Sequence, residues 1–261
     1  MSNEGRLLEP TVDGVEVAWS SAIDLIARRF ESVRDAYGPE SIAFYVSGQL
    51  LTEDYYVVNK FVKGYLGTAN IDTNSRLCMA SSVAAHKRAF GSDTVPGCYE
   101  DLELADVVVL VGSNLCWCHP VLFQRILKAR VQNPAMQTIV IDPRRTATAE
   151  LCDQHLQIKA GSESDAVLFL GLLKFLSDHD GLNQEWVEQY TNGIEAALEA
   201  AAEWTLSEVA AFTGLSETEV RVFYQLYLNH KKVVTVYSQG VNQSHKGTDT
   251  VNTIINVHLA T

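Results

Sequence analysis

Residues 106–114 read Asp-Val-Val-Val-Leu-Val-Gly-Ser-Asn, and this stretch decides the fold that we expect. The apolar run within it has the length of one strand, and an unbroken run of this kind is typical of a parallel strand buried on both faces. It ends in Gly112, Ser113 and Asn114, and Pro120 suits the first turn of the helix that follows. The stretch therefore predicts a strand, a turn and a helix in succession.

The rest of the chain repeats this alternation. Helices are predicted at 52–66, 79–90, 166–176 and 248–259, with several short ones between 183 and 229, and the other strands near 42–47, 137–141, 155–158 and 233–238. Thr205 to Glu208 and Ser216 to Glu219 each have the spacing of a helix capping box. Strands that alternate with helices predict an α/β fold with a doubly wound, mostly parallel sheet.

A helix is also predicted before the first strand. Trp19, Ile23, Ile26 and Phe30 recur at helical spacing and fall on one face. Ser20 or Ser21 is the expected cap at its start, because a hydroxyl can accept from the first free backbone N–H groups.

Composition excludes several classes of protein. The chain has 261 residues, 47% of them apolar and 20% charged, which is ordinary for a soluble globular protein. A net charge of −12 argues against a nucleic-acid partner, and no apolar run approaches the length of a membrane span. The opening Met-Ser-Asn-Glu-Gly-Arg resembles neither a signal peptide nor a twin-arginine leader, and five irregularly spaced cysteines fit a reducing cytoplasm. We therefore expect a cytoplasmic protein.

Four predicted strands end in small or polar residues, and these endings predict a binding rim. In a parallel sheet, ligands bind outside the carboxyl ends of the strands. The residues alone therefore predict a nucleotide-like ligand at one edge. The four endings are Gly48-Gln49, Gly112-Ser113-Asn114, Asp142-Pro143, and Gln239-Gly240 with Asn242 and Gln243.

Several residues near this rim have two alternative roles. Asp142 accepts hydrogen bonds from a ribose diol or a guanine edge, or it is a plain turn residue before proline. Asp165 is a guanine acceptor or an acid at a helix N-terminus, and Arg144 and Arg145 meet phosphate or are simply solvated.

Cys78 lies in a polar turn just before the helix predicted at 79–90. The positive end of the peptide dipoles and the charge of Arg76 both favour the thiolate, the form that attacks or binds a metal. The alternative is a buried cysteine that acts as a small apolar side chain. Cys-Trp-Cys-His at 116–119 is too tight for an ordinary structural zinc site.

Five segments carry a resemblance to a known family. They are 67–82 (with Ser-Arg-Leu-Cys-Met-Ala-Ser-Ser at its end), 97–106, 112–122, 141–146 and 239–243. Together they resemble the catalytic subunit of the assimilatory nitrate reductases, which are molybdopterin oxidoreductases of the bis-molybdopterin guanine dinucleotide type. Formate dehydrogenases share the scaffold but usually carry histidine after the ligand cysteine, so Met79 points to nitrate.

The resemblance implies roles for individual residues. Cys78 would be the molybdenum ligand and the catalytic residue. The loop at 161–165 is longer than the usual turn of the family, which bears on Ser164. The residues implied to contact the pterin dinucleotides are Gln49, Asn74, Gly112, Ser113, Asn114, Asp142, Arg144, Arg145, Ser164, Asp165, Gln239 and Gln243.

The resemblance also implies an activity and a domain plan. Nitrate would be reduced to nitrite by oxygen-atom transfer in nitrate assimilation, with electrons from a ferredoxin, a flavodoxin or an NADH-linked subunit through a [4Fe-4S] cluster. Residues 75–261 would form most of a Rossmann-like domain, as in formate dehydrogenase and DMSO reductase, and 1–74 pieces of neighbouring domains. Alternatives are a formate dehydrogenase-type molybdoenzyme and a non-catalytic nucleotide-binding module.

Two departures from the family predict a fragment. No run of four cluster-binding cysteines precedes Arg6, and the chain stops where the family continues with a long second half. We therefore expect the chain alone to be inactive, and to self-associate through an apolar surface that the second half would cover.

Overall fold

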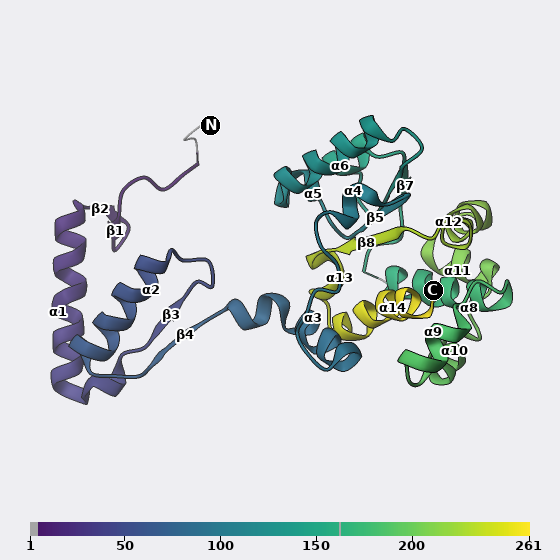
Figure 1. Cartoon of the computed structure of the whole chain (residues 1–261). Helices are drawn as coiled ribbons and strands as arrows, with labels where there is room; N and C mark the ends of the chain where they lie inside the picture. The colour runs from purple at the N-terminus through teal and green to yellow at the C-terminus, as the bar shows by residue number, and fades with distance from the viewer. Residues whose placement is uncertain (1–4, 162) are drawn as a thin grey trace. The chain divides into compact units, whose positions relative to one another are not determined.

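The computed structural model describes residues 5–161 and 163–261, and the chain divides into two compact units. One unit extends to Leu77 and the other runs from Cys78 to Thr261 (Figure 1). The predicted domain limits, 1–74 and 75–261, remain a prediction about the domains of the family.

The N-terminal unit contains a short hairpin, a long helix and a two-stranded parallel sheet. The predicted helix at 52–66 is present, but it changes from α to π geometry at Lys60 and ends at Gly67, whose φ of 79° suits glycine. The hairpin and β4 are too short for a periodic signal, so they were not predicted. The elements are β1 (Thr11–Val12), β2 (Val15–Glu16), α1 (Trp19–Tyr37), η1 (Pro39–Ser41), β3 (Phe44–Val46), α2 (Thr52–Asn59), η2 (Lys60–Leu66) and β4 (Ile71–Thr73).

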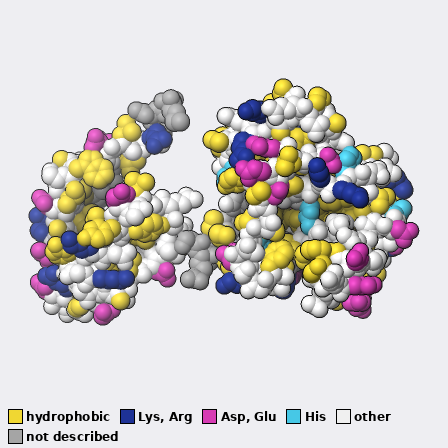
Figure 2. All heavy atoms as spheres, viewed as in Figure 1, with side chains coloured by type: hydrophobic (Ala, Val, Ile, Leu, Met, Phe, Trp, Pro, Cys, Tyr) yellow, Lys and Arg dark blue, Asp and Glu magenta, His cyan; other side chains and the backbone are white. Residues whose placement is uncertain are grey.

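Helix α1 differs from its prediction in two ways. Ala18 occupies the N-cap without a side-chain hydrogen bond, so the predicted capping by Ser20 or Ser21 is wrong. The predicted apolar face is exposed, with Trp19 at 64%, Ile23 at 57% and Ile26 at 53%. Periodicity shows which residues share a face of a helix, but not what covers that face. Figure 2 shows hydrophobic side chains at the surface of this unit.

The second unit is built on a four-stranded sheet, which confirms the predicted parallel α/β class. The strands lie in the order β7-β6-β5-β8 and all three pairings are parallel. Every residue of β5 is buried, as its apolar run predicts. The strands are β5 (Val107–Val111), β6 (Gln137–Ile141), β7 (Gln154–Leu156) and β8 (Val233–Tyr237).

Helices cover both faces of this sheet (Figure 1). Val107, Val109 and Val111 belong to one hydrophobic cluster with α8 (Ser164–Asp178) and α14 (Gly247–Ala260). Val108 and Leu110 belong to the other cluster, with α4 and α6. The remaining helices of the unit are α3 (Ser75–Phe90), α4 (Asp101–Leu104), α5 (Leu115–Cys118), α6 (Pro120–Gln132), α7 (Ala147–Leu151), α9 (Gln184–Tyr190), α10 (Ile194–Ala201), α11 (Leu206–Thr213), α12 (Glu217–Asn229) and α13 (Gln239–Asn242).

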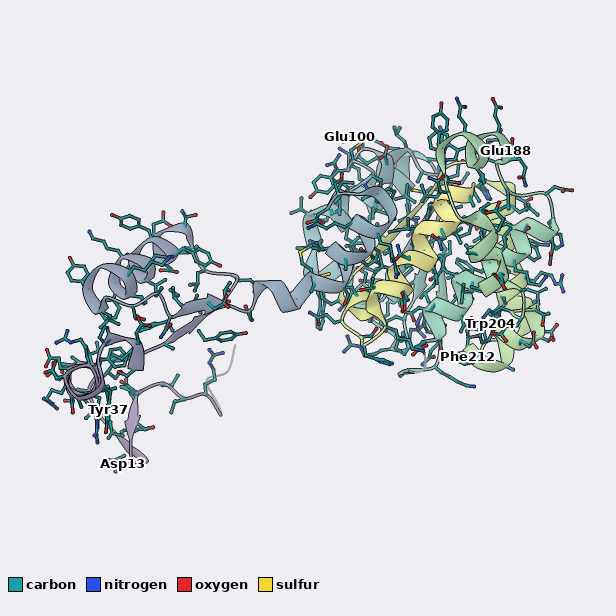
Figure 3. The ribbon with its side chains drawn as sticks, turned by 90° about the horizontal axis from the view of Figure 1, so that it is seen from below. Asp13, Tyr37, Glu100, Glu188, Trp204 and Phe212 are labelled. Atoms are coloured by element: carbon teal, nitrogen blue, oxygen red, sulfur yellow. The ribbon has the colours of Figure 1, made fainter. Side chains whose placement is uncertain are left out.

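Three helices of the second unit start at the predicted signals. Pro120 occupies the first turn of α6, and capping boxes open α11 and α12. At α12 the Glu219 N–H donates to Ser216 Oγ over 3.2 Å, and the Ser216 N–H donates to the Glu219 carboxylate over 2.8 Å. Beside α11, Trp204 and Phe212 meet edge to face with ring centroids 5.4 Å apart (Figure 3).

The order of the strands reverses at β5. From β5 the chain adds β6 and then β7 on one side, and it returns through α8 to α12 to place β8 on the other side. In open parallel sheets, ligands bind at such a switch point, outside the carboxyl ends of the two central strands, which here are β5 and β8. No helix among the described residues is long and apolar enough to cross a membrane.

Candidate functional site

The loops that follow β5 and β8 touch through two glycines. A Cβ atom on Gly112 would lie 2.8 Å from the Cα of Gly240, and a Cβ on Gly240 would lie 2.6 Å from the Cα of Gly112. The Gly240 N–H donates to the carbonyl of Gly112 over 3.2 Å. Beside them, the hydroxyls of Ser113 and Ser238 are 2.8 Å apart. Only glycine allows this approach, so the contact between the two segments depends on both positions.

Asn114 is held by a residue that the sequence did not single out. Its Oδ1 accepts from the hydroxyl of Thr148 over 2.8 Å, and that hydroxyl accepts from the N–H of Cys116 over 2.9 Å. The side chain of Asn114 does not cap α5. The helix predicted from Pro120 is present as α6, and a single helical turn, α5, comes before it.

At the end of β6, Asp142 has the role of a turn residue, one of the two roles predicted for it. Its Oδ1 accepts from the backbone N–H of Arg144 over 2.8 Å, and its carbonyl accepts from Nε2 of His155 over 2.8 Å. Asp142 is half-buried, whereas Arg144 and Arg145 are exposed. All three follow the same edge of the sheet as Gly112, because β6 pairs with β5 in register up to Val111 and Ile141.

Hydrogen bonds hold Cys78 to the segment that follows β8. Its carbonyl accepts from Nδ2 of Asn242 over 3.1 Å and from Nε2 of Gln243 over 3.2 Å. The same Nε2 lies 3.6 Å from the sulfur of Cys78, which is half-buried. The structure therefore brings together two residues that the family resemblance assigned to one cofactor.

The helix around Cys78 is broken. Met79 has non-helical dihedral angles (φ −132°, ψ 18°), so Cys78 ends a first helical turn and the main part of α3 starts after the break. The prediction of a non-helical turn before residue 79 is therefore wrong, although the predicted end at Phe90 is confirmed. The contribution predicted for Arg76 concerns a side chain that lies outside the described residues.

The loop before α8 reaches the same edge. Ser164 is buried, and Asp165 accepts from the Ala166 N–H over 3.1 Å. Burial raises the pKa of Asp165 above its usual value, and hydrogen bonds from backbone N–H groups partly oppose this. Glu163, in the left-handed region at φ 55°, forms an ion pair of 3.0 Å with Lys246 in the segment that follows Gln243.

Gln49 and Asn74 belong to the N-terminal unit and lie near each other there. The Gly48 N–H donates to Oδ1 of Asn74 over 2.9 Å, at the carboxyl ends of the paired strands β3 and β4. The Gln49 N–H donates to the hydroxyl of Ser47 over 3.1 Å. Because Cys78 belongs to the other unit, the approach of Gln49 and Asn74 to it stays a prediction.

In the second unit, the structure brings the predicted residues to one edge of the sheet. The contacts that do so join segments far apart in the chain, and sequence reasoning missed Thr148, Glu163 and Lys246, which have no local motif. Assembled here are Cys78, Gly112, Ser113, Asn114, Asp142, Arg144, Arg145, Ser164, Asp165, Gln239 and Gln243.

The donor set at this edge fits a metal that brings most of its own ligands. Within residues 5–161 and 163–261, no group of three or more His, Cys, Asp or Glu side chains is placed to hold a metal ion. Cys78 supplies a single soft sulfur donor. A metal bound there would take its other donors from an organic, sulfur-rich ligand.

A parallel sheet with helices on both faces and polar residues beyond its strand ends places the second unit among the α/β proteins, which bind ligands at this edge of the sheet. The chain belongs to the molybdopterin oxidoreductase family, whose model matches residues 6–261. This confirms the family resemblance.

Three relatives and one solved structure show the range of this similarity. The chain is 48% identical to a nitrate reductase of Klebsiella oxytoca over 98% of the chain. It is 53% identical to a nitrate reductase of Shewanella frigidimarina over 95% of the chain. It covers 29% and 26% of those two proteins. A periplasmic nitrate reductase of Desulfovibrio desulfuricans is 35% identical over 99% of the chain and is covered to 34%. Acetylene hydratase from Pelobacter acetylenicus has a TM-score of 0.64 at 25% identity, covering 94% of this chain and 32% of that one.

Proposed function

We propose that this chain is part of a nitrate reductase and that Cys78 binds its molybdenum. The observation that carries the proposal is the attachment of Cys78 to Asn242 and Gln243, beside the switch point between β5 and β8. The identity of 48–53% to proteins named nitrate reductase supports nitrate as the substrate. When bound, the molybdenum–pterin group supplies oxygen-atom transfer, and the protein holds and tunes it.

The residues of the chain would hold this cofactor in distinct ways. Cys78 donates its thiolate sulfur, while the amide of Gln243 holds the Cys78 segment in place. The backbone of the loop at 112–114 and the exposed Arg144 and Arg145 suit phosphate groups. The carboxylates of Asp142 and Asp165 are acceptors for the N–H groups of a guanine or the hydroxyls of a ribose, which supports the guanine dinucleotide form. We assign Gln49, Asn74, Ser164 and Gln239 to the same cofactor on the family motif.

The finer features of the parent enzyme are part of this proposal. We assign it to nitrate assimilation in the cytoplasm, since identity to the periplasmic relative is lower, at 35%. Electrons would come from a ferredoxin, a flavodoxin or an NADH-linked subunit through a [4Fe-4S] cluster outside these residues. The sheet would be the doubly wound, Rossmann-like core of its domain, which the strand reversal at β5 supports.

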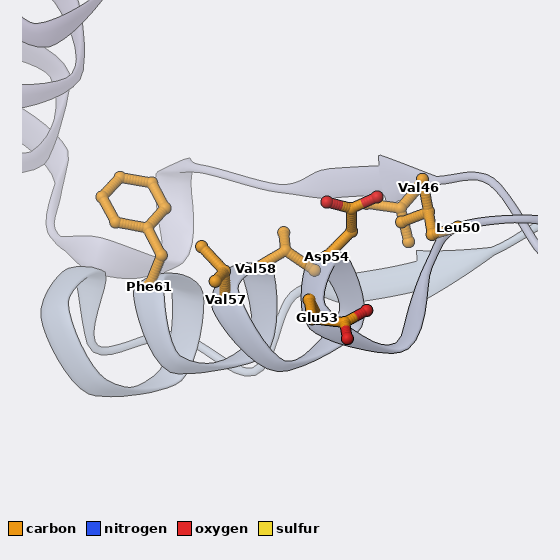
Figure 4. Close-up of a pocket in the computed structure, with 7 residues that line it drawn as sticks. All are labelled: Val46, Leu50, Glu53, Asp54, Val57, Val58 and Phe61. Atoms are coloured by element: carbon orange, nitrogen blue, oxygen red, sulfur yellow. The ribbon is translucent and has the colours of Figure 1, made fainter.

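We further propose that these 261 residues alone do not reduce nitrate and that they self-associate. They cover only 26–29% of the nitrate reductases from Klebsiella oxytoca and Shewanella frigidimarina. Apolar surface is open in the N-terminal unit, where a groove beside β3 and α2 is lined by Val46, Val57, Val58 and Phe61 (Figure 4). Exposed apolar patches favour association between copies.

The test uses protein expressed from the complete reading frame. Cys78→Ala should abolish nitrite formation with a reduced dye, because the metal loses its protein ligand, and Cys98→Ala is the matched control on an exposed cysteine. Molybdenum content and the release of guanine nucleotide on denaturation identify the cofactor. An active Cys78→Ala protein would overturn the ligand assignment.

The same preparation separates the alternatives. Formate oxidation without nitrate reduction would support the formate dehydrogenase reading. A protein that binds guanine nucleotide without molybdenum would support a non-catalytic module. For the 261-residue chain, nitrate turnover with stoichiometric molybdenum would contradict the proposed inactivity, and a monomer in sedimentation would contradict self-association.

A further inference from the structure

A chain of hydrogen bonds joins helix α3 to the end of strand β8. The hydroxyl of Tyr237 bonds to the hydroxyl of Ser82 and lies 3.0 Å from Nε2 of His86. Nδ1 of His86 lies 2.5 Å from the carbonyl oxygen of Thr94. Residues from a helix, a strand and a loop therefore meet at one phenol group.

The directions of these bonds follow from the chemistry of the groups. A carbonyl oxygen only accepts, so Nδ1 of His86 carries the hydrogen that it donates to Thr94. In neutral His86, Nε2 is then the acceptor and the hydroxyl of Tyr237 donates to it. The phenol oxygen is left to accept from the buried hydroxyl of Ser82. Each group has one consistent role, which fixes the orientation of α3 against β8.

Helix α3 is interrupted at Met79, so the segment with Cys78 and the main part of the helix each need their own attachment. The connection between Cys78 and Ser82 is only a few residues long, so the position of the helix still limits where Cys78 can lie. Cys78 is held on one side of the break by Asn242 and Gln243. The helix on the other side is held to α14 by hydrogen bonds from Thr248 and Asn252 to the carbonyls of Ser81 and Ala85, and to the end of β8 by Tyr237. Tyr237 therefore lies in the same segment, 237–243, as the two residues that hold Cys78.

We infer that Tyr237 is a positioning residue that holds the Cys78 thiol beside the switch point between β5 and β8 through Ser82 and His86. The inference rests on the proposed role of Cys78 as a metal ligand. Tyr237 is suited to the task because it is the last residue of β8 and pairs in register with Val111 at the switch point. Its ring also meets His86 edge to face, with centroids 6.2 Å apart.

The state of the phenol agrees with its role as a donor. Partial burial raises the pKa of Tyr237, which the hydrogen bond from Ser82 partly opposes, so the hydroxyl keeps its proton at neutral pH. Phenylalanine at this position would keep the ring and lose both hydrogen bonds. The buried hydroxyl of Ser82 and Nε2 of His86 would then lose their partner.

Tyr227 provides a matched control for Tyr237→Phe, and it lies on α12, the helix that precedes β8 in the chain. The hydroxyl of Tyr227 on α12 lies 2.7 Å from Oγ1 of Thr235, which is in the middle of β8. Tyr227 is buried, and its ring contacts His258 rather than α3. Tyr227→Phe therefore also removes a buried phenol hydroxyl that bonds to β8, but without touching the attachment of α3.

The test measures the reactivity of Cys78 in the metal-free 261-residue chain. The chain is treated with iodoacetamide for timed intervals, and the alkylation of Cys78 is compared by peptide mass spectrometry with that of the exposed Cys98 in the same sample. Tyr237→Phe should raise the ratio about fivefold, the factor equivalent to one net hydrogen bond. Tyr227→Phe should leave the ratio unchanged.

Substitutions at His86 provide a second, independent test. His86→Leu removes the acceptor and should act like Tyr237→Phe, so the test remains available if Tyr237→Phe does not fold. His86→Gln carries a carbonyl oxygen that can accept from Tyr237, and it should keep the native ratio. An unchanged ratio in folded Tyr237→Phe or His86→Leu, or an equal rise in Tyr227→Phe, would overturn the inference.

The alkylation rate also separates this inference from the proposed function. It is measured without metal or nitrate, so it reports the placement of the thiol even if the complete protein holds no molybdenum. Conversely, a molybdenum-containing nitrate reductase in which Tyr237→Phe leaves the Cys78 ratio unchanged would keep the proposed function and refute only the positioning role.

Discussion

Gly112 provides the most direct test of the contact between the segments that follow β5 and β8. A methyl group in Gly112→Ala would lie 2.8 Å from the Cα and 2.9 Å from the carbonyl carbon of Gly240. Both atoms are backbone, so no side chain can turn away to make room. The substitution also places alanine at a φ of +53°, a region that side-chain-bearing residues rarely adopt.

The two effects can be separated by a control in the same unit. Gly193 has a φ of +81°, and a methyl group added there would meet nothing within 4 Å, so Gly193→Ala measures the backbone strain alone. We expect that strain to lower the free energy of unfolding by about 1–2 kcal/mol. Overpacking adds about 1–3 kcal/mol, so Gly112→Ala should lose about 2–5 kcal/mol.

Urea unfolding followed by tryptophan fluorescence measures these changes. Three of the four tryptophans, Trp117, Trp186 and Trp204, lie in the second unit and report on it. Gly240→Ala should also destabilise, and the double variant should lose less than the two single losses together, because both methyl groups disrupt the same contact. Equal losses in Gly112→Ala and Gly193→Ala would refute the close approach.

Three further predictions concern buried or capping groups. Burial lowers the pKa of His258 from 6.5 to about 4, so folding favours its neutral form. The contribution of His258 to the free energy of unfolding is complete above pH 6.5. It should fall by about 3 kcal/mol as the pH drops from 6.5 to about 4. Urea unfolding should show a shallower fall with pH in His258→Gln. Since the pKa of Asp165 is raised, its ionised form destabilises the fold as the pH rises, and Asp165→Asn should melt at a higher temperature at neutral pH; a lower melting temperature would contradict this. Ser216→Ala should lose about 1 kcal/mol of unfolding free energy with the cap of α12, and an unchanged value would show that the cap does not stabilise the unit.

Patterns within a few residues were enough to predict most elements of the second unit. The apolar run at 107–111 became the buried strand β5, and the capping boxes at Thr205 and Ser216 opened α11 and α12. Apolar runs, caps and glycine or proline turns act over one or two turns of chain, so the sequence records them directly. The residues around Cys78 likewise carried the family resemblance.

The candidate site was predicted in part for the same reason. Strand endings identified Asp142 and the loop at 112–114 as members of one rim, because parallel strands end at a common edge. Local patterns failed where surroundings decide the outcome, as at α1, whose apolar face is exposed, and at β4, which has only three residues. Neither the exposure of α1 nor the presence of β4 can be predicted from the periodicity of its own segment.

The sequence by itself therefore determined the class of the fold, and it predicted the edge of the sheet and the cysteine of the candidate site. Only the tertiary structure decided the strand order that places the switch point between β5 and β8, and the meeting of Gly112 with Gly240. It also decided the bond between Ser82 and Tyr237, which are 155 residues apart in the chain. Contacts at such separations arise from the packing of whole elements, and a single sequence carries no local signal for which distant side chains that packing will join.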